Sequence, residues 1–311
     1  MLHLSDIRCV IPDERPSLFE LKQRYAVDPA ELIVFHRIYG LERVPVSRGP
    51  ILDLLSGAAA QVIDHAAIDL KAVRCMVHTH TGQPHVQAAE PLLARVARRL
   101  GLSHARLWGM TTNNCASTIV ALQLIDRMLA TADDDACAIL VVGDIAFTPI
   151  LQIIPHSSVT GDAAVACLLR RRAPGHRVLA TRTDVYGQHS RCQWQSKEED
   201  AEFEAEYPQR LARTMSLALE QAGLSWNDIR RVIPHNVNTY SWKRVAKAAG
   251  IPIQLIYLDQ VPNIAHCFGA DILLNWHLAE QEQMFRAGDY VVLATVGLGA
   301  VFAAAVIQYG P

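Results

Sequence analysis

Apolar residues recur along the chain with two periods, one typical of helices and one typical of buried strands. Helical spacing covers residues 53–67, 91–100 and 116–129. Short runs rich in apolar residues at 73–77, 138–142 and 163–169 predict strands, and the run at 138–142 is apolar throughout, as in a strand buried on both faces. Because helices and strands alternate, the pattern predicts an α/β fold.

The same pattern returns about 155 residues later in the chain. Residues 67–77 and 223–233 lie 156 positions apart, and each segment runs from a helix end through an acidic turn into a strand. A shift of 154 positions carries Cys115, its helix and the strand that ends at Gly143 onto Gly269, residues 270–284 and residues 290–297. Two segments with nearly one offset predict a duplication, which we divide into halves 1–172 and 173–311.

Composition limits the class of protein. The chain has 311 residues, of which 50% are hydrophobic and 19% charged, so it can bury a large core. A formal net charge of −2 argues against a partner that is a nucleic acid or an anionic membrane surface. No basic segment precedes an apolar core at the start, and no run approaches the roughly 18 apolar residues of a membrane span. We therefore expect a cytoplasmic protein.

Cysteine and histidine spacing does not indicate a metal site. The seven cysteines are scattered without C-x-x-C pairs, so neither a disulfide framework nor a zinc site is predicted. His78 and His80 share one face of a predicted strand, but no third ligand accompanies them in the sequence. We interpret both histidines as residues at the end of that strand and expect no metal.

Cys115 stands where a polar turn at residues 111–114 meets the start of an amphipathic helix. The unpaired backbone N–H groups and the dipole of a helix start favour a thiolate over a thiol. The sequence therefore marks Cys115 as a candidate nucleophile. The alternative is that Cys115 is a small buried hydrophobic residue, as free cysteines usually are.

A duplicated α/β chain with this cysteine resembles the thiolase-like condensing enzymes, and specifically 3-oxoacyl-acyl-carrier-protein synthase III. Residues 114–116 resemble the family's A-C-A-G motif, residues 160–164 its F-G-D-G-A-G motif, and residues 232–238 its V-P-H-Q-A-N motif. Residues 259–263 and 295–299 stand in the places of its G-N-T-S segment and its C-terminal glycine-rich turn. The resemblance covers essentially the whole chain. It implies a thiolase-like fold with five layers, α-β-α-β-α, and a homodimer.

The resemblance also implies roles for individual residues. In the family, the cysteine takes an acyl group from a thioester, and a histidine and an asparagine then stabilise the enolate that a malonyl thioester forms on losing carbon dioxide. Cys115, His235 and Asn263 match these positions. The oxyanion hole is expected at the backbone N–H groups of Cys115 and of Gly297-Leu298-Gly299. Substrate contacts are expected at Arg37, Asn238 and Phe268. No cofactor is implied beyond the thioester itself.

The chain departs from the family on both sides of the predicted pocket. His266 lies in the segment that replaces the small polar G-N-T-S-A-A-S run, and it is a candidate second base that activates an alcohol or amine acceptor. Leu298 replaces the middle glycine of the last turn. Residues 33–43 resemble the family's N-terminal W-I-x-x-R-T-G-I-x-x-R strand, but Val34 or Phe35 stands near the place of the tryptophan that stacks on coenzyme A. An acyl carrier protein is therefore the expected carrier of the donor, with coenzyme A as the alternative.

Three hypotheses for the function remain open. His235 and Asn263 favour decarboxylative condensation in fatty-acid, polyketide or other secondary-metabolite biosynthesis. His266 favours the alternative, an acyltransferase that makes an ester or amide. The third hypothesis is a non-catalytic partner subunit, against which the retention of the cysteine, histidine and asparagine argues. The acidic run at residues 197–206 predicts only a solvated helix face.

Overall fold

The computed structural model describes residues 1–23, 28–82, 90–172 and 174–310. In this part of the chain nine strands form one sheet in the order β3-β2-β4-β7-β1-β8-β11-β10-β9. The strands of the first half are β1 (His3–Val10), β2 (Val73–Thr79), β3 (Arg106–Met110), β4 (Cys137–Asp144) and β7 (Ala163–Arg170). Those of the second half are β8 (His176–Val185), β9 (Ile229–Pro234), β10 (Tyr290–Gly297) and β11 (Val301–Gln308). A short pairing of β1 with β8 joins the halves.

The two halves of the sheet repeat one pattern of pairing. In the first half β2 is parallel to β4, β4 is antiparallel to β7, and β7 is antiparallel to β1. In the second half β9 is parallel to β10, β10 is antiparallel to β11, and β11 is antiparallel to β8. The same order and the same directions support the predicted duplication, while the exact division between residues 172 and 173 stays a prediction.

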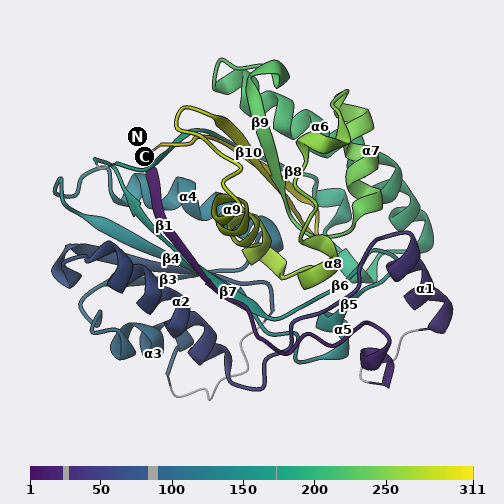
Figure 1. Cartoon of the computed structure of the whole chain (residues 1–311), viewed down its shortest axis with the longest axis horizontal. Coiled ribbons are helices and arrows are strands. Elements are labelled where there is room, and N and C mark those ends of the chain that lie inside the picture. The colour runs from purple at the N-terminus through teal and green to yellow at the C-terminus, as the bar shows by residue number, and fades with distance from the viewer. Residues whose placement is uncertain (24–27, 83–89, 173, 311) are drawn as a thin grey trace.

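Helices form three layers around and between the halves of the sheet (Figure 1). Helices α2 (Ile51–Ala66) and α3 (Leu92–Arg99) contact the first half, and α6 (Lys197–Gln221) contacts the second half and carries α7 (Thr239–Ala249). Helices α4 (Ser117–Met128) and α9 (Asp271–Gln281) lie in the middle and contact strands of both halves. The expected five-layered α-β-α-β-α arrangement is therefore confirmed.

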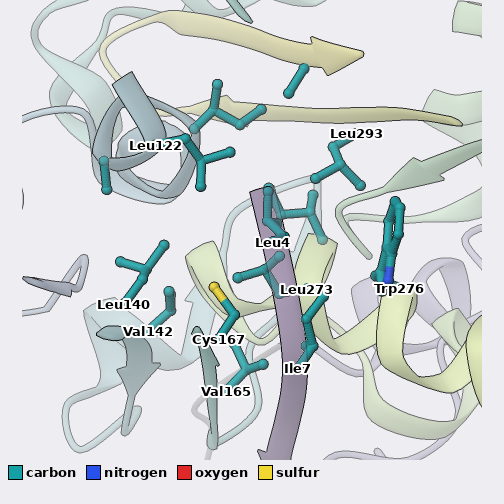
Figure 2. Packing of buried hydrophobic residues seen from close by; sticks show 14 of the residues in the cluster. Leu4, Ile7, Leu122, Leu140, Val142, Val165, Cys167, Leu273, Trp276 and Leu293 are labelled. Atoms are coloured by element: carbon teal, nitrogen blue, oxygen red, sulfur yellow. The ribbon is translucent and has the colours of Figure 1, made fainter. Parts of the chain in front are cut away.

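Alternation along β4 shows why this strand is apolar throughout. Ala138, Leu140 and Val142 belong to the central hydrophobic cluster, whereas Cys137, Ile139 and Val141 belong to the cluster beneath α2 and α3. Successive side chains of a strand point to opposite faces, so a strand between two helical layers needs apolar residues at every position. Figure 2 shows the central cluster, where Leu140 of β4 lies among side chains that include Leu122 of α4.

Shorter elements connect these layers. They are the helices α1 (Pro29–Arg37), α5 (Pro149–Gln152) and α8 (Val261–Ile264), the strands β5 (Ile153–Ile154) and β6 (Ser158–Val159), and the 3-10 turns η1 (Glu20–Gln23), η2 (Leu70–Ala72), η3 (Asn114–Ala116), η4 (Gly187–His189), η5 (Cys192–Trp194), η6 (Trp226–Asp228), η7 (Ile253–Leu255) and η8 (Phe268–Ala270). The expectation of a strand beginning at residue 33 is wrong, because residues 33–37 belong to α1. The Asp28 side chain accepts from Ala30 N at 2.8 Å, and Pro29 starts the helix. Among the described residues, none of the helices is both long and apolar enough to cross a membrane.

The starts of α4 and α9 are equivalent and pack against each other at the centre. Each helix follows a 3-10 turn, and the residues that begin the two turns, Asn114 and Phe268, both have positive φ angles, 48° and 54°. These residues are separated by the offset that relates the sequence halves. Thr118 Oγ1 donates to Gly269 O at 2.8 Å, and a Cβ on Gly269 would lie 3.2 Å from Cys115 O. The glycine at the second helix start therefore lets the backbone at Cys115 approach closely.

Candidate active site

A cavity of about 40 Å³ lies beside Cys115, where the two halves of the chain meet. Its wall includes His235 after β9, His266 after α8, and Tyr207 on α6. A larger cavity of about 240 Å³ adjoins it. The two cavities share part of their walls, namely Ile154, Ser157, Phe203, Glu204 and Leu298. The larger cavity is therefore the vestibule of the smaller one.

Cys115 occupies the middle of η3, one turn before α4 begins, and its residue surface is 4% exposed. Its Sγ lies 3.5 Å from His266 Nε2 and 3.6 Å from Thr81 Oγ1. Both neighbours can donate a hydrogen bond to sulfur, and a thiolate accepts such bonds better than a thiol does. The position predicted for a nucleophile therefore also has donors arranged around the sulfur.

Asp271 holds the opposite side of the His266 ring. His266 Nδ1 lies 2.5 Å from Asp271 Oδ2, and this carboxylate also accepts from Cys267 N at 2.7 Å and from Asn236 N at 2.6 Å. Asp271 is completely buried and is the first residue of α9, where the helix dipole stabilises a negative charge. Sulfur, imidazole and carboxylate thus form a continuous row.

The charges of this row favour a protonated imidazole. Burial lowers the pKa of His266, but the Asp271 carboxylate and Cys115 raise it more strongly, to about 10. At neutral pH the ring therefore carries a proton on each nitrogen, one shared with Asp271 and one directed at the sulfur. An imidazolium at this distance is placed to donate a hydrogen bond to the sulfur, as in sites that activate a nucleophilic cysteine.

His235 lines the same cavity in the opposite protonation state. Burial and the neighbouring His266 lower its pKa to about 3. Its Nε2 lies 3.2 Å from the Tyr207 hydroxyl, and its ring centroid is 5.8 Å from that of His266. Nδ1 has no hydrogen-bond partner within the described part of the chain. One cavity therefore combines a cationic and a neutral histidine.

The predicted position of Asn263 is wrong. This residue is exposed on α8, its Nδ2 donates to Asp259 O at 3.3 Å, and it is not among the described residues that line the two cavities. Val261 and Ile264 are buried on the inner face of the short helix, which turns Asn263 outward. The residue beside the sulfur is His266, which follows a chain reversal at Ala265, where φ is 46°.

The glycine-rich turn lies against the nucleophile segment, as expected for an oxyanion hole. A Cβ on Gly297 would lie 2.0 Å from Asn113 O, so the two backbones are in contact. Asn114 Nδ2 donates to Leu298 O at 2.6 Å, and Leu298 lines the cavity with Cys115. Gly299 has a φ of 118°, which favours glycine. The role of these N–H groups and that of Cys115 N in binding an oxyanion stays a prediction.

The three residues predicted to bind substrate lie in different surroundings. Phe268 is buried, and its ring centroid is 5.9 Å from that of His266. Asn238 instead caps α7, because Oδ1 accepts from Ser241 N at 2.6 Å and Nδ2 donates to Ser157 O at 2.9 Å. Arg37 is exposed at the end of α1. Asn238 and Arg37 are absent from the described linings of both cavities, so the structure does not place them at the substrate.

Sequence reasoning missed Asp271, Tyr207 and Thr81. A signal for Asp271 was present, because it is an acidic residue at the start of a helix, directly before three apolar residues and five positions after a candidate base. Tyr207 and Thr81 gave no such signal. His78 and His80 stack at 4.7 Å, and the described residues include no group of three or more histidine, cysteine or acidic side chains that could hold a metal.

Comparison with known proteins finds relatives of one kind. The family model described as 3-Oxoacyl-[acyl-carrier-protein (ACP)] synthase III C terminal matches residues 219–309. A beta-ketoacyl-[acyl-carrier-protein] synthase III from Rhizorhabdus wittichii is 27% identical over 212 residues, which cover 63% of this chain. The match spans 65% of that relative, slightly less than two thirds of its length.

Solved structures match over nearly the whole chain. One described as "ChlB3 [Aceyltransferase]" is 18% identical, with a TM-score of 0.87 and coverage of 99% of this chain and 97% of the other. The 3-oxoacyl-[acyl-carrier-protein] synthase III from Aquifex aeolicus VF5 is 17% identical, with a TM-score of 0.80 and coverage of 99% and 100%. The fold is therefore thiolase-like, and the chain is distantly similar to 3-oxoacyl-acyl-carrier-protein synthase III, with the family model matching its C-terminal part.

Proposed function

We propose that the protein is an acyltransferase in which Cys115, His266 and Asp271 act as a catalytic triad. The observation that carries the proposal is the buried row of contacts from Sγ to Nε2 at 3.5 Å and from Nδ1 to Oδ2 at 2.5 Å. A nucleophile, a base and a carboxylate that orients the base are the groups that acyl transfer to an oxygen or nitrogen acceptor requires.

In the first half of the reaction, the Cys115 thiolate attacks the carbonyl carbon of an acyl thioester. The negative charge that develops on the carbonyl oxygen is held by backbone N–H groups of Cys115 and of the turn at Gly297 to Gly299. The bond to the carrier sulfur then breaks, and His266 Nε2 gives its proton to the departing thiolate. An acyl-cysteine and a neutral His266 remain, with the proton on Nδ1 still shared with Asp271.

In the second half, His266 acts as a general base. An alcohol or amine acceptor reaches the acyl-cysteine through the vestibule, and His266 Nε2 takes its proton while the oxygen or nitrogen attacks the carbonyl carbon. The bond to Cys115 breaks and the ester or amide leaves. The thiolate and the imidazolium are regenerated, so each half of the cycle moves one proton through the same nitrogen.

Decarboxylative condensation is the second candidate. It is favoured by His235, which lines the cavity with Cys115 and could donate a hydrogen bond to a malonyl thioester. The position of Asn263 weakens this candidate, because the residue lies outside the cavity. His266 would then have to supply the second hydrogen-bond donor. We place acyl transfer first because it needs a general base beside the acyl-cysteine, and His266 is in contact with the sulfur.

For the donor, we propose an acyl group carried by an acyl carrier protein. Phe35 is completely buried and cannot stack on an adenine, and Val34, which is 40% exposed, offers no ring. Without that stacking, coenzyme A is expected to lose about tenfold to a hundredfold in affinity. A carrier protein presents the same arm without an adenine.

We also propose a homodimer that forms along β3. This strand is the edge of the sheet, and its exposed side chains include Leu107 and Trp108, which are 36% and 48% exposed. An apolar sheet edge is a surface that another copy of the chain can cover. Light scattering should give the mass of a dimer, and Trp108→Glu should shift it toward the monomer; a wild-type monomer would contradict this part of the proposal.

Intact-mass analysis tests the proposed reaction. Incubation with acyl thioesters should add one acyl group, mapped to Cys115, and the adduct should be absent in Cys115→Ala. The loaded enzyme is then offered a panel of alcohols and amines, or labelled malonyl thioester. Loss of the adduct to an alcohol or amine without carbon dioxide supports acyl transfer. Release of labelled carbon dioxide from the acylated enzyme would instead favour condensation.

A further inference from the structure

Asp144, the last residue of β4, is a buried carboxylate that the proposed reaction does not use. It is 5% exposed. Both of its oxygens accept from Thr81 N at 3.0 Å, and Oδ1 also accepts from Gly82 N at 2.8 Å. A buried carboxylate costs free energy unless such bonds compensate for the lost water. These three bonds fix the backbone of residues 81 and 82 against the end of β4.

The segment that Asp144 holds contacts the nucleophile. Thr81 Oγ1 lies 3.6 Å from Cys115 Sγ, and Thr111 Oγ1 donates to Thr81 O at 3.4 Å. A Cβ on Gly82 would lie 3.0 Å from Leu151 Cδ1, and Leu151 packs against the cluster that contains Cys115. The segment is therefore fixed between Asp144 on one side and the surroundings of the sulfur on the other.

We propose that Asp144 is a positioning residue that holds the Thr81 hydroxyl against Cys115, so that Thr81 Oγ1 donates a hydrogen bond to the thiolate. The inference rests on the proposed role of Cys115 as the nucleophile. Thr81 is the residue that touches the reacting sulfur, and Asp144 acts through it. A carboxylate suits this position because it offers two acceptor oxygens and no donor, whereas an amide would turn its NH₂ group toward a backbone N–H.

The charge of Asp144 links this contact to pH. Burial raises the pKa of Asp144 to about 7, against the hydrogen bonds from Gly82 and Thr81 and the charge of His266. Titratable and charged groups face Asp144 from each neighbouring element. Four of them line one cavity with Asp144, namely Arg48, His78, His80 and Arg95. The charges of His266 and Asp162 also act on Asp144. Protonation on Oδ2 places an O–H group opposite Thr81 N and breaks that bond, while Oδ1 still accepts from Thr81 N and Gly82 N with the carboxylate charge gone. The hydrogen bonding of Asp144 to the backbone of Thr81 should therefore strengthen as pH rises through about 7.

The test is the rate at which iodoacetamide alkylates Cys115, followed by peptide mass mapping from pH 5.5 to 8.5. In Asp144→Asn we expect the rate at pH 8 to fall about tenfold, the size of one lost hydrogen bond to a charged group, and the rise near pH 7 to flatten. Thr81→Val should lower the rate by a similar factor, and Thr81→Ser should restore it. The matched control is Asp162→Asn, which removes another buried carboxylate that accepts from Ala146 N at 2.8 Å and Ser47 N at 2.7 Å.

Two results would overturn the inference. One is a wild-type rate and pH profile in Thr81→Val, a variant that leaves the buried carboxylate intact and so tests the contact even if Asp144→Asn fails to fold. The other is an equal loss in Asp162→Asn, which would assign the effect to general damage. Alkylation needs no thioester, so failure of acyl transfer with an intact alkylation pattern would contradict the proposed function and leave this inference standing.

Discussion

Replacing Asp271 with asparagine tests the triad most directly, because the substitution keeps the shape of the side chain and removes its charge. The carboxylate accepts from His266 Nδ1, from Cys267 N and from Asn236 N. An amide has one acceptor oxygen and one donor group. Cys267 N donates to Oδ1, whereas His266 Nδ1 and Asn236 N share Oδ2, so the amide nitrogen of Asp271→Asn faces either Cys267 N or both of the other donors.

The structure indicates how large the effect should be. Burial lowers the pKa of His266, and the Asp271 carboxylate is the first of the groups that raise it to about 10. Without this charge the ring tends to be neutral, and the positive charge beside Cys115 is lost. Where the amide nitrogen faces Nδ1, the ring proton stays on Nε2, which then has no lone pair to act as a base. Loss of a positioned base costs about 10²–10⁴ in rate, which corresponds to roughly 2.7–5.4 kcal/mol in activation free energy.

The assay separates the two half-reactions by quenched-flow mass spectrometry of a single turnover. Acylation of Cys115 should slow because the ion pair is lost, and transfer to the acceptor should slow because the base is lost. The free energy of unfolding should fall by about 1–3 kcal/mol for the unsatisfied buried group, measured separately by urea titration. Asn263→Ala is the control, since the side chain of Asn263 is exposed and donates to the nearby Asp259 O.

A transfer rate in Asp271→Asn within tenfold of the wild type would refute the triad, provided that the variant is folded. The same conclusion would follow if Asn263→Ala lost activity as strongly as Asp271→Asn. In that case the exposed asparagine would matter more than the buried carboxylate, and the geometry of the cavity would not explain the chemistry.

Three further predictions follow from packing and protonation. Gly297→Ala places a Cβ 2.0 Å from Asn113 O, so we expect a loss of about 3 kcal/mol or more in urea titration, and stability equal to the wild type would contradict the close packing of the turn. Trp276→Ala removes a completely buried ring from the central cluster shown in Figure 2 and should cost about 3–5 kcal/mol by the same method; a cost below about 1 kcal/mol would contradict its role in the core. Burial lowers the pKa of His266 but Asp271 and Cys115 raise it from 6.5 to about 10, so its stabilising effect is complete below pH 6.5 and is lost as pH rises toward 10. Between pH 6.5 and 10 the free energy of unfolding should therefore fall less in His266→Gln than in the wild type. An equal fall in both proteins would exclude His266 as the source of the pH dependence.

Much of the fold follows from patterns that are local in the sequence. The strand at residues 138–142 is apolar because helical layers cover both of its faces, and this requirement is visible without any knowledge of the neighbours. The duplication was visible for the same reason, since both halves repeat the same burial pattern. The polar turn before Cys115 likewise predicted a helix start, and the structure places the cysteine in η3, directly before α4.

The sequence by itself determined the α/β alternation, the duplication and the nucleophile candidate, because each depends on local segments and their periods. The five layers and the candidate base His266 came from the resemblance to a known family. The tertiary structure alone decided which side chains meet at the sulfur. Asn263 and His266 are three residues apart, and the burial of Val261 and Ile264 together with the reversal at Ala265 turns one to solvent and the other to Cys115. Thr81, Tyr207 and Asp271 come from distant segments, and a hydrogen bond between distant segments leaves no periodic trace in either of them.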